Sequence, residues 1–167
     1  HYRGTSYKTS ANHPYPTPIK KTIDYIKFLK KKHGYNKIFL CTEENIFLNK
    51  LKKYYGNKLF FIDTYRVNIN LFSSHVPAFK NYPRKNHRYL LGKESLMESL
   101  ILSKCHGLTY VKTNVISAAK LFTEIKQNDH PVNIGFNSSN RFISRWLWYV
   151  KNLLPQKLGG FKEITYE

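Results

Sequence analysis

The chain has 167 residues, of which 41% are hydrophobic, and this length suits one domain with a core but not two ordinary domains. Its formal net charge of +18 arises from 28 lysines and arginines against 10 acidic residues, which favours an anionic partner such as nucleic acid, an acidic membrane or a small anion. No apolar run approaches the roughly 20 residues that cross a bilayer, so no membrane segment and no particular compartment are predicted. Lysine is abundant and arginine is scarce, so arginines in particular places carry most of the information.

Helical and strand-like patterns alternate along the chain. The first helix is predicted to begin at Thr17-Pro18 and to end at Gly34, and Thr42 is expected to cap a second helix that ends at Gly56. Further helices are predicted at 94–104, 117–127 and 139–154. Short apolar runs, typical of strands buried on both faces of a parallel sheet, lie at 37–41, 59–62, 108–111 and 132–135. Between 65 and 88 the pattern predicts a long loop.

This alternation predicts an α/β fold, a Rossmann-like parallel sheet with helices on both faces. We expect residues 1–135 to form this domain and 136–167 to form a C-terminal helix and tail, in which Trp146, Trp148 and Tyr149 pack into the core or against another domain. His1 to Thr5 has the character of a strand end and the turn after it, which predicts that the chain is the second half of a longer protein.

Two polar segments follow predicted strands, at the edge where parallel sheets bind ligands. In Arg3-Gly4-Thr5-Ser6, the glycine lets main-chain amides approach an anion and the arginine can fork onto phosphate oxygens. Lys112-Thr113-Asn114 lies at a helix start, where unpaired amides suit a diphosphate. Each segment also has a purely structural interpretation, in which Arg3 pairs with a carboxylate and Thr113 or Asn114 caps a helix.

Three segments together resemble the nucleotide-binding half of fucosyltransferases of the α-1,6 and nodulation types, whose first motif reads H-x-R-R-T-D. The matching segments are His1-Tyr2-Arg3-Gly4-Thr5, Phe39-Leu40-Cys41-Thr42-Glu43-Glu44 and the run from Leu96 to Cys105. The resemblance implies the C-terminal half of a GT-B glycosyltransferase that binds GDP-fucose and transfers fucose with inversion to a glycan acceptor. It also implies that the enzyme needs no metal or cofactor and has an N-terminal domain in the same protein.

The resemblance assigns roles by position. His1 would approach the guanine or its linkage, Arg3 would be the catalytic cation that stabilises the β-phosphate as GDP leaves, and Glu98 would accept the donors of the guanine edge. The full substrate-binding set that it implies is His1, Arg3, Gly4, Thr5, Ser6, Glu98, Thr113 and Asn114. Gly4 and Ser6 depart from the family motif, where a second arginine and an aspartate stand.

Two other functions remain open. One is a basic polyanion-binding module, because a charge of +18 and 16% aromatic residues suit single-stranded nucleic acid. The other is a degenerate transferase fold that binds a nucleotide sugar without turnover, which the departures at Gly4 and Ser6 favour. Cys41 and Cys105 are expected to be free buried thiols, and neither has ligand spacing for zinc.

Overall fold

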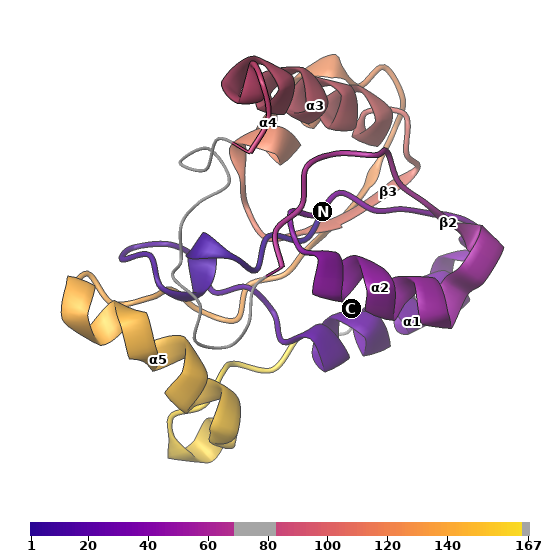
Figure 1. The fold of residues 1–167 in the computed structure, drawn as a ribbon. Helices are drawn as coiled ribbons and strands as arrows, with labels where there is room; N and C mark the ends of the chain where they lie inside the picture. The colour runs from indigo at the N-terminus through magenta and orange to yellow at the C-terminus, as the bar shows by residue number, and fades with distance from the viewer. Residues whose placement is uncertain (69–82, 165–167) are drawn as a thin grey trace.

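The protein has an α/β fold in which helices cover both faces of short parallel strands (Figure 1). The computed structural model describes residues 1–68 and 83–164. The helices are α1 (Ile19–His33), α2 (Asn45–Tyr55), α3 (His87–Leu102), α4 (Asn114–Phe122) and α5 (Arg141–Leu153), with 3-10 turns at Ser6–Lys8, Gly56–Lys58 and Gln156–Leu158. The strands are β1 (Ile38–Phe39), β2 (Leu59–Phe60), β3 (Gly107–Tyr110) and β4 (Asn128–Pro131).

The strands form two parallel pairs, β1 with β2 and β3 with β4, and the N-terminal residues connect these pairs. Tyr2 forms a parallel bridge with Thr42, and its amide donates to the Cys41 carbonyl at 2.9 Å. On the other side, the His1 nitrogen donates to the Thr109 carbonyl at 2.9 Å. The lateral order is therefore β2, β1, residues 1–2, β3 and β4, which places the N-terminus at the centre.

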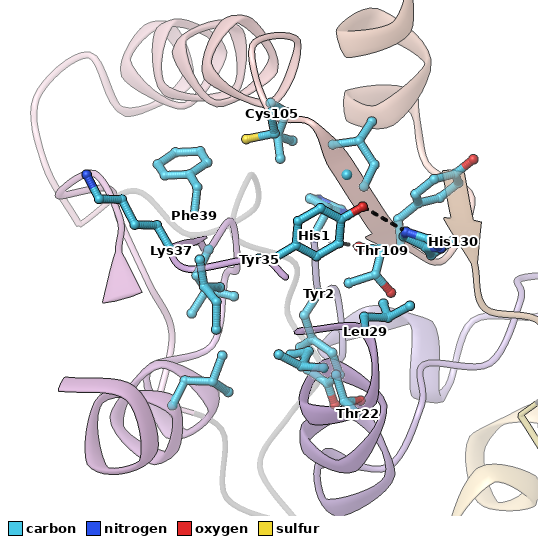
Figure 2. A pocket seen from close by; sticks show the side chains of 18 of the residues that line it. His1, Tyr2, Thr22, Leu29, Tyr35, Lys37, Phe39, Cys105, Thr109 and His130 are labelled. Atoms are coloured by element: carbon cyan, nitrogen blue, oxygen red, sulfur yellow. Dashed lines mark hydrogen bonds between the residues drawn. The ribbon is translucent and has the colours of Figure 1, made fainter. Parts of the chain in front are cut away.

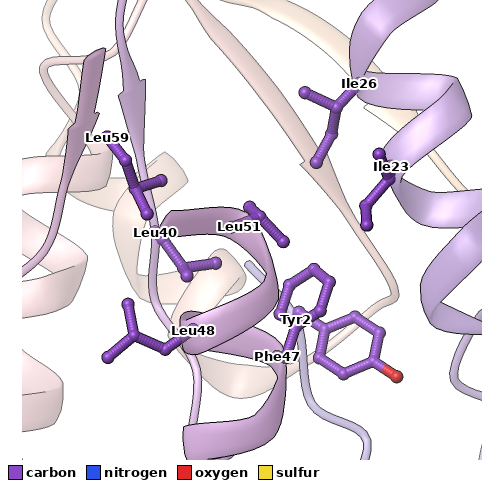
Figure 3. Close-up of a cluster of buried hydrophobic side chains, with 8 residues drawn as sticks. All are labelled: Tyr2, Ile23, Ile26, Leu40, Phe47, Leu48, Leu51 and Leu59. Atoms are coloured by element: carbon purple, nitrogen blue, oxygen red, sulfur yellow. The ribbon is translucent and has the colours of Figure 1, made fainter. Parts of the chain in front are cut away.

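The apolar side chains divide between the two faces of this arrangement. Leu40 joins a cluster under α1 and α2 (Figure 3), whereas its neighbour Cys41 joins a cluster under α3 and α4, as alternation along a strand requires. In the first cluster the Tyr2 and Phe47 rings are stacked with their centroids 3.9 Å apart. The core thus binds the central strand to α2.

A third apolar cluster holds α5 against the rest of the chain. Trp148 is buried beside Tyr15 and Phe161, and its indole nitrogen donates to the Pro16 carbonyl at 2.8 Å. Trp146, by contrast, is 64% exposed. Trp146 and Trp148, which were expected to pack together, are therefore separated, because residues two positions apart lie on different sides of a helix.

Several predicted boundaries were wrong. Thr42 does not cap α2: its Oγ1 accepts from the Glu44 amide at 3.2 Å and the helix begins at Asn45, so Glu44 precedes the first turn. The helix predicted at 94–104 begins seven residues earlier, and α4 begins at Asn114 rather than Ser117. The last strand lies at 128–131 instead of 132–135, because the Asn128 amide bonds the His106 carbonyl and sets the register.

Truncating the centre of the first cluster should destabilise the whole fold. We expect Phe47→Ala to lower the free energy of unfolding by about 3–5 kcal/mol, because the fully buried ring leaves a cavity beside Tyr2. Phe142→Ala is the matched control, because that ring is 79% exposed and its loss should change little. Urea unfolding of both variants measures the difference, and equal losses would contradict the packing described.

Candidate functional site

The carboxyl edge of the central strands gathers most of the predicted site residues. Because β1 and β2 lie on one side of residues 1–2 and β3 and β4 lie on the other, the strand order reverses beside the N-terminal segment. Parallel sheets bind ligands in the crevice at such a reversal. The loops that leave it carry Arg3 to Ser6 on one side and Thr113 on the other.

His1 and Thr113 are brought together at this reversal. Thr113 is buried at the start of α4, where its Oγ1 accepts from the Ile116 amide at 3.4 Å. The same oxygen lies 3.5 Å from Nδ1 of His1, a long contact. Asn114 is the first residue of α4 and is exposed. Thr113 thus makes the predicted cap, and it also places the helix N-terminus beside the His1 ring.

Arg3 contacts a carboxylate, as its structural interpretation predicted. Its guanidinium lies 3.2 Å from Glu43, which follows β1, and stands over the Tyr7 ring at 5.3 Å. Thr5 is buried and donates to the other Glu43 oxygen at 3.0 Å. The Arg3 Nε is buried without a hydrogen-bond partner in the described residues. Glu43 therefore fixes the direction of a partly exposed guanidinium that keeps one buried donor unpaired.

Gly4 has a packing role that the sequence did not indicate. A Cβ at this position would lie 2.8 Å from the Tyr2 ring and 2.9 Å from the Glu44 carboxyl carbon. Glu44 is buried and pairs with Lys8 at 3.4 Å. Burial raises the pKa of the Glu44 carboxyl above its ordinary value, against the lowering effect of Lys8. Gly4 therefore makes room for a buried carboxylate, whereas it was expected to bring main-chain amides to an anion.

Ser6 opens the 3-10 turn Ser6–Lys8 and is half-buried. Its carbonyl accepts from the Ser10 amide at 2.9 Å and from the Thr9 amide at 3.2 Å. These bonds fold the segment after Arg3 back toward the sheet edge. The structure therefore gives Ser6 a part in the turn that positions Thr5 and Lys8.

Glu98 faces the same edge from α3. Burial, above all, raises the pKa of its carboxyl to about 7, and Arg66 opposes that rise. Arg66 follows β2, and its guanidinium donates to the carbonyls of Ile62 at 2.6 Å and Thr64 at 3.2 Å. The Arg66 Nε, like that of Arg3, is buried without a partner in the described residues. A carboxyl that titrates near neutrality thus lies near a fixed cation.

Sequence reasoning missed several members of this charged edge. They are Arg66 and the pair Arg84 and Glu94, which lie 2.7 Å apart. Glu43 and Glu44, which stand in a segment quoted for the resemblance, join this edge as the partners of Arg3 and Lys8. The signal for Arg66 was present, because it is one of only six arginines and comes soon after an apolar strand, as Arg3 does. Most of the loop predicted between 65 and 88, from 69 to 82, lies outside the described residues.

The side chains that could bind a metal ion are dispersed over the described residues. Among residues 1–68 and 83–164, no three His, Cys, Asp or Glu side chains are grouped to hold a metal ion. Cys41 and Cys105 are free thiols, Cys41 buried and Cys105 half-buried. No described helix is long and apolar enough to span a membrane.

Comparison of the chain with protein-family models, with curated proteins and with solved structures gives no match in any of the three. The resemblance to fucosyltransferases therefore stays a prediction. What the structure supplies independently is the position of His1, Arg3 and Thr113 at one edge of a parallel sheet.

Adding one methyl group at Gly4 should destabilise the protein. We expect Gly4→Ala to cost about 1–3 kcal/mol in free energy of unfolding, because the new Cβ meets the Tyr2 ring and the Glu44 carboxylate. Gly92→Ala is the control, since that glycine is exposed within α3 with open space around it, and alanine there should stabilise by about 0.5–1 kcal/mol. Thermal unfolding measures both; a neutral Gly4→Ala would contradict the close packing.

Glu98 should make stability depend on pH in a defined direction. The folded protein holds the Glu98 proton more tightly than the unfolded chain, since the pKa rises from 4.5 to about 7. Its contribution is therefore complete below about pH 4.5 and is lost as the pH rises through 7. Glu98→Gln should match the parent chain at pH 4.5 and exceed it by up to about 3 kcal/mol at pH 8. Denaturation curves that differ by the same amount at both pH values would contradict this.

Proposed function

We propose that the chain is the donor-binding half of a fucosyltransferase, which holds GDP-fucose at the edge formed by His1, Arg3 and Thr113 and passes fucose to a glycan hydroxyl with inversion. The observation that carries this is the convergence of the N-terminal segment and the start of α4 at the reversal of strand order. This is where α/β sheets bind nucleotides, and a helix N-terminus there attracts a diphosphate.

The chemistry follows from the groups at the edge. In the transfer step the acceptor oxygen forms a bond to the sugar carbon while the bond from that carbon to the β-phosphate oxygen breaks. The electron pair leaves with GDP, so negative charge grows on the phosphate. The guanidinium of Arg3, whose side chain is 26% exposed and held by Glu43, can meet that charge. Glu98, when ionised, can accept two hydrogen bonds from the guanine edge.

Titration calorimetry with GDP tests binding. We expect the chain to bind GDP and Arg3→Ala to weaken the affinity by about tenfold or more, because a hydrogen bond to a charged group is lost. Arg145→Ala is the matched control: this exposed arginine lies over the Phe142 ring on α5, so its loss should not matter. Failure to bind GDP, or equal affinity for Arg3→Ala and Arg145→Ala, would remove the proposed function.

A nucleotide-sugar-binding domain without turnover is the second candidate, and the Arg3 ion pair with Glu43 favours it. A guanidinium held by a carboxylate is partly neutralised, and Gly4, where the resembled motif has a second arginine, makes room for Glu44 instead. Assay of fucose release from GDP-fucose separates the two candidates. Turnover supports the transferase, whereas GDP binding with no release or transfer supports the binding domain.

The polyanion-binding alternative receives less support from this edge. Four of the chain's ten acidic residues gather there, and Arg3, Lys8 and Arg84 are each paired with one of them. A groove for a nucleic-acid backbone would instead present unpaired cations. GDP affinity that changes little between moderate and high salt favours the discrete site, and a steep fall of RNA affinity with salt favours the alternative.

A further inference from the structure

A large apolar slot separates β1 from β3 on the amino side of His1 (Figure 2). Its volume is about 820 Å³, and its walls are the two strands, with α1 contributing Ile26 and Leu29. Phe39 and Lys37 lie on one side of it, and His1 and Thr109 lie toward the opposite side. The slot is therefore continuous with the groove in which residues 1–2 already lie.

The β1 wall presents an unused strand edge. The Leu40 amide donates to the Phe60 carbonyl, so Leu40 faces β2. Alternation then turns the main chain of Phe39 and Cys41 the other way, and the Cys41 carbonyl indeed accepts from Tyr2. No hydrogen bond from the described residues reaches the Phe39 main chain on this side. Phe39 is thus the next residue of β1 whose main chain could pair with a strand in the slot.

The β3 wall repeats the pattern. The carbonyls of His106 and Tyr110 accept from β4 and the residue after it, so these residues face away from the slot. Gly107 and Thr109 face into it, and the Thr109 carbonyl accepts from His1. Within the described part of the chain, the slot-facing main chain of Gly107 has no partner either. The edges of β1 and β3 therefore face each other across the slot, and each has one residue, Phe39 or Gly107, whose main-chain groups lack a hydrogen-bond partner in the described residues.

The spacing of the two walls suits one strand. At the level of His1 and Tyr2, a single segment bonds Thr109 on one side and Cys41 on the other, each at 2.9 Å. Tyr2 lies opposite Thr42 and runs parallel to β1, so a strand that reached the level of Ile38 would need about three residues ahead of His1. The lining is apolar on both faces, as around a central parallel strand.

We propose that the slot is the seat of an extended apolar peptide segment that runs parallel to β1 and β3, meets His1 at its carboxyl end and completes the sheet between Phe39 and Gly107. Its main chain would bond both walls, and its side chains would enter the clusters under α1 and α3. A small apolar ligand would fill the volume but would leave the two strand edges unpaired.

Extensions of the full chain test this. Val-Ile-Val is placed before His1 in one variant and Gly-Ser-Gly in a second, and a third carries Val-Pro-Val, which lacks one main-chain donor. Hydrogen exchange is read at the amides of Phe39 and Gly107. We expect the Val-Ile-Val extension to slow exchange at both amides at least tenfold relative to Gly-Ser-Gly, with a smaller effect for Val-Pro-Val.

The remaining outcomes distinguish the proposed peptide segment from other occupants of the slot. The apolar dye 1-anilinonaphthalene-8-sulfonate should bind the Gly-Ser-Gly variant and be excluded from the Val-Ile-Val variant. Equal dye binding by both would show that the slot takes a separate ligand and would overturn the proposal. Equal exchange in all variants, unfolding of the Val-Ile-Val variant alone, or concentration-dependent dimerisation that protects the same two amides would overturn it as well.

Discussion

Two main-chain hydrogen bonds at the N-terminus hold the arrangement together. Tyr2 donates to Cys41 and His1 donates to Thr109, and through them two separate two-stranded ladders become one parallel array. The stacking of Tyr2 on Phe47 holds this segment against α2. The positions of Arg3 and Thr5 at the carboxyl edge depend on it, because both residues leave from this segment and meet Glu43 after β1.

The edge is a network of paired charges within a strongly basic protein. Glu43 holds Arg3, Glu44 holds Lys8 and Glu94 holds Arg84, each at 3.4 Å or less. Such pairs in partly buried surroundings fix the direction of a guanidinium more than they stabilise the fold. The guanidinium groups of Arg3, held by Glu43, and of Arg66, held by two carbonyls, are then cations of defined position. A compact anion with few contact points suits this arrangement better than a long polyanion does.

Local patterns predicted the α/β class and α1, which Gly34 ends as expected; Gly34 has a left-handed conformation. They failed at β4, where hydrogen bonds to the neighbouring strand select Asn128 to Pro131 over the more apolar residues that follow. The pairing of Arg3 with Glu43 joins residues 40 positions apart, so no local spacing reveals it, although a carboxylate partner was one of the two interpretations of Arg3. The contact of Gly4 with Glu44 likewise joins residues 40 positions apart, so the sequence around Gly4 did not indicate its packing role.

The central structural claim is that residues 1–2 form the middle strand, and exchange of the Tyr2 amide tests it most directly. A donor in the centre of a sheet exchanges only when the whole domain opens, so its opening free energy should equal that of core amides in α2, such as Leu51. We predict equal values for these two amides across a denaturant series. Fast exchange at Tyr2, typical of a frayed terminus, while Leu51 stays protected would contradict the account.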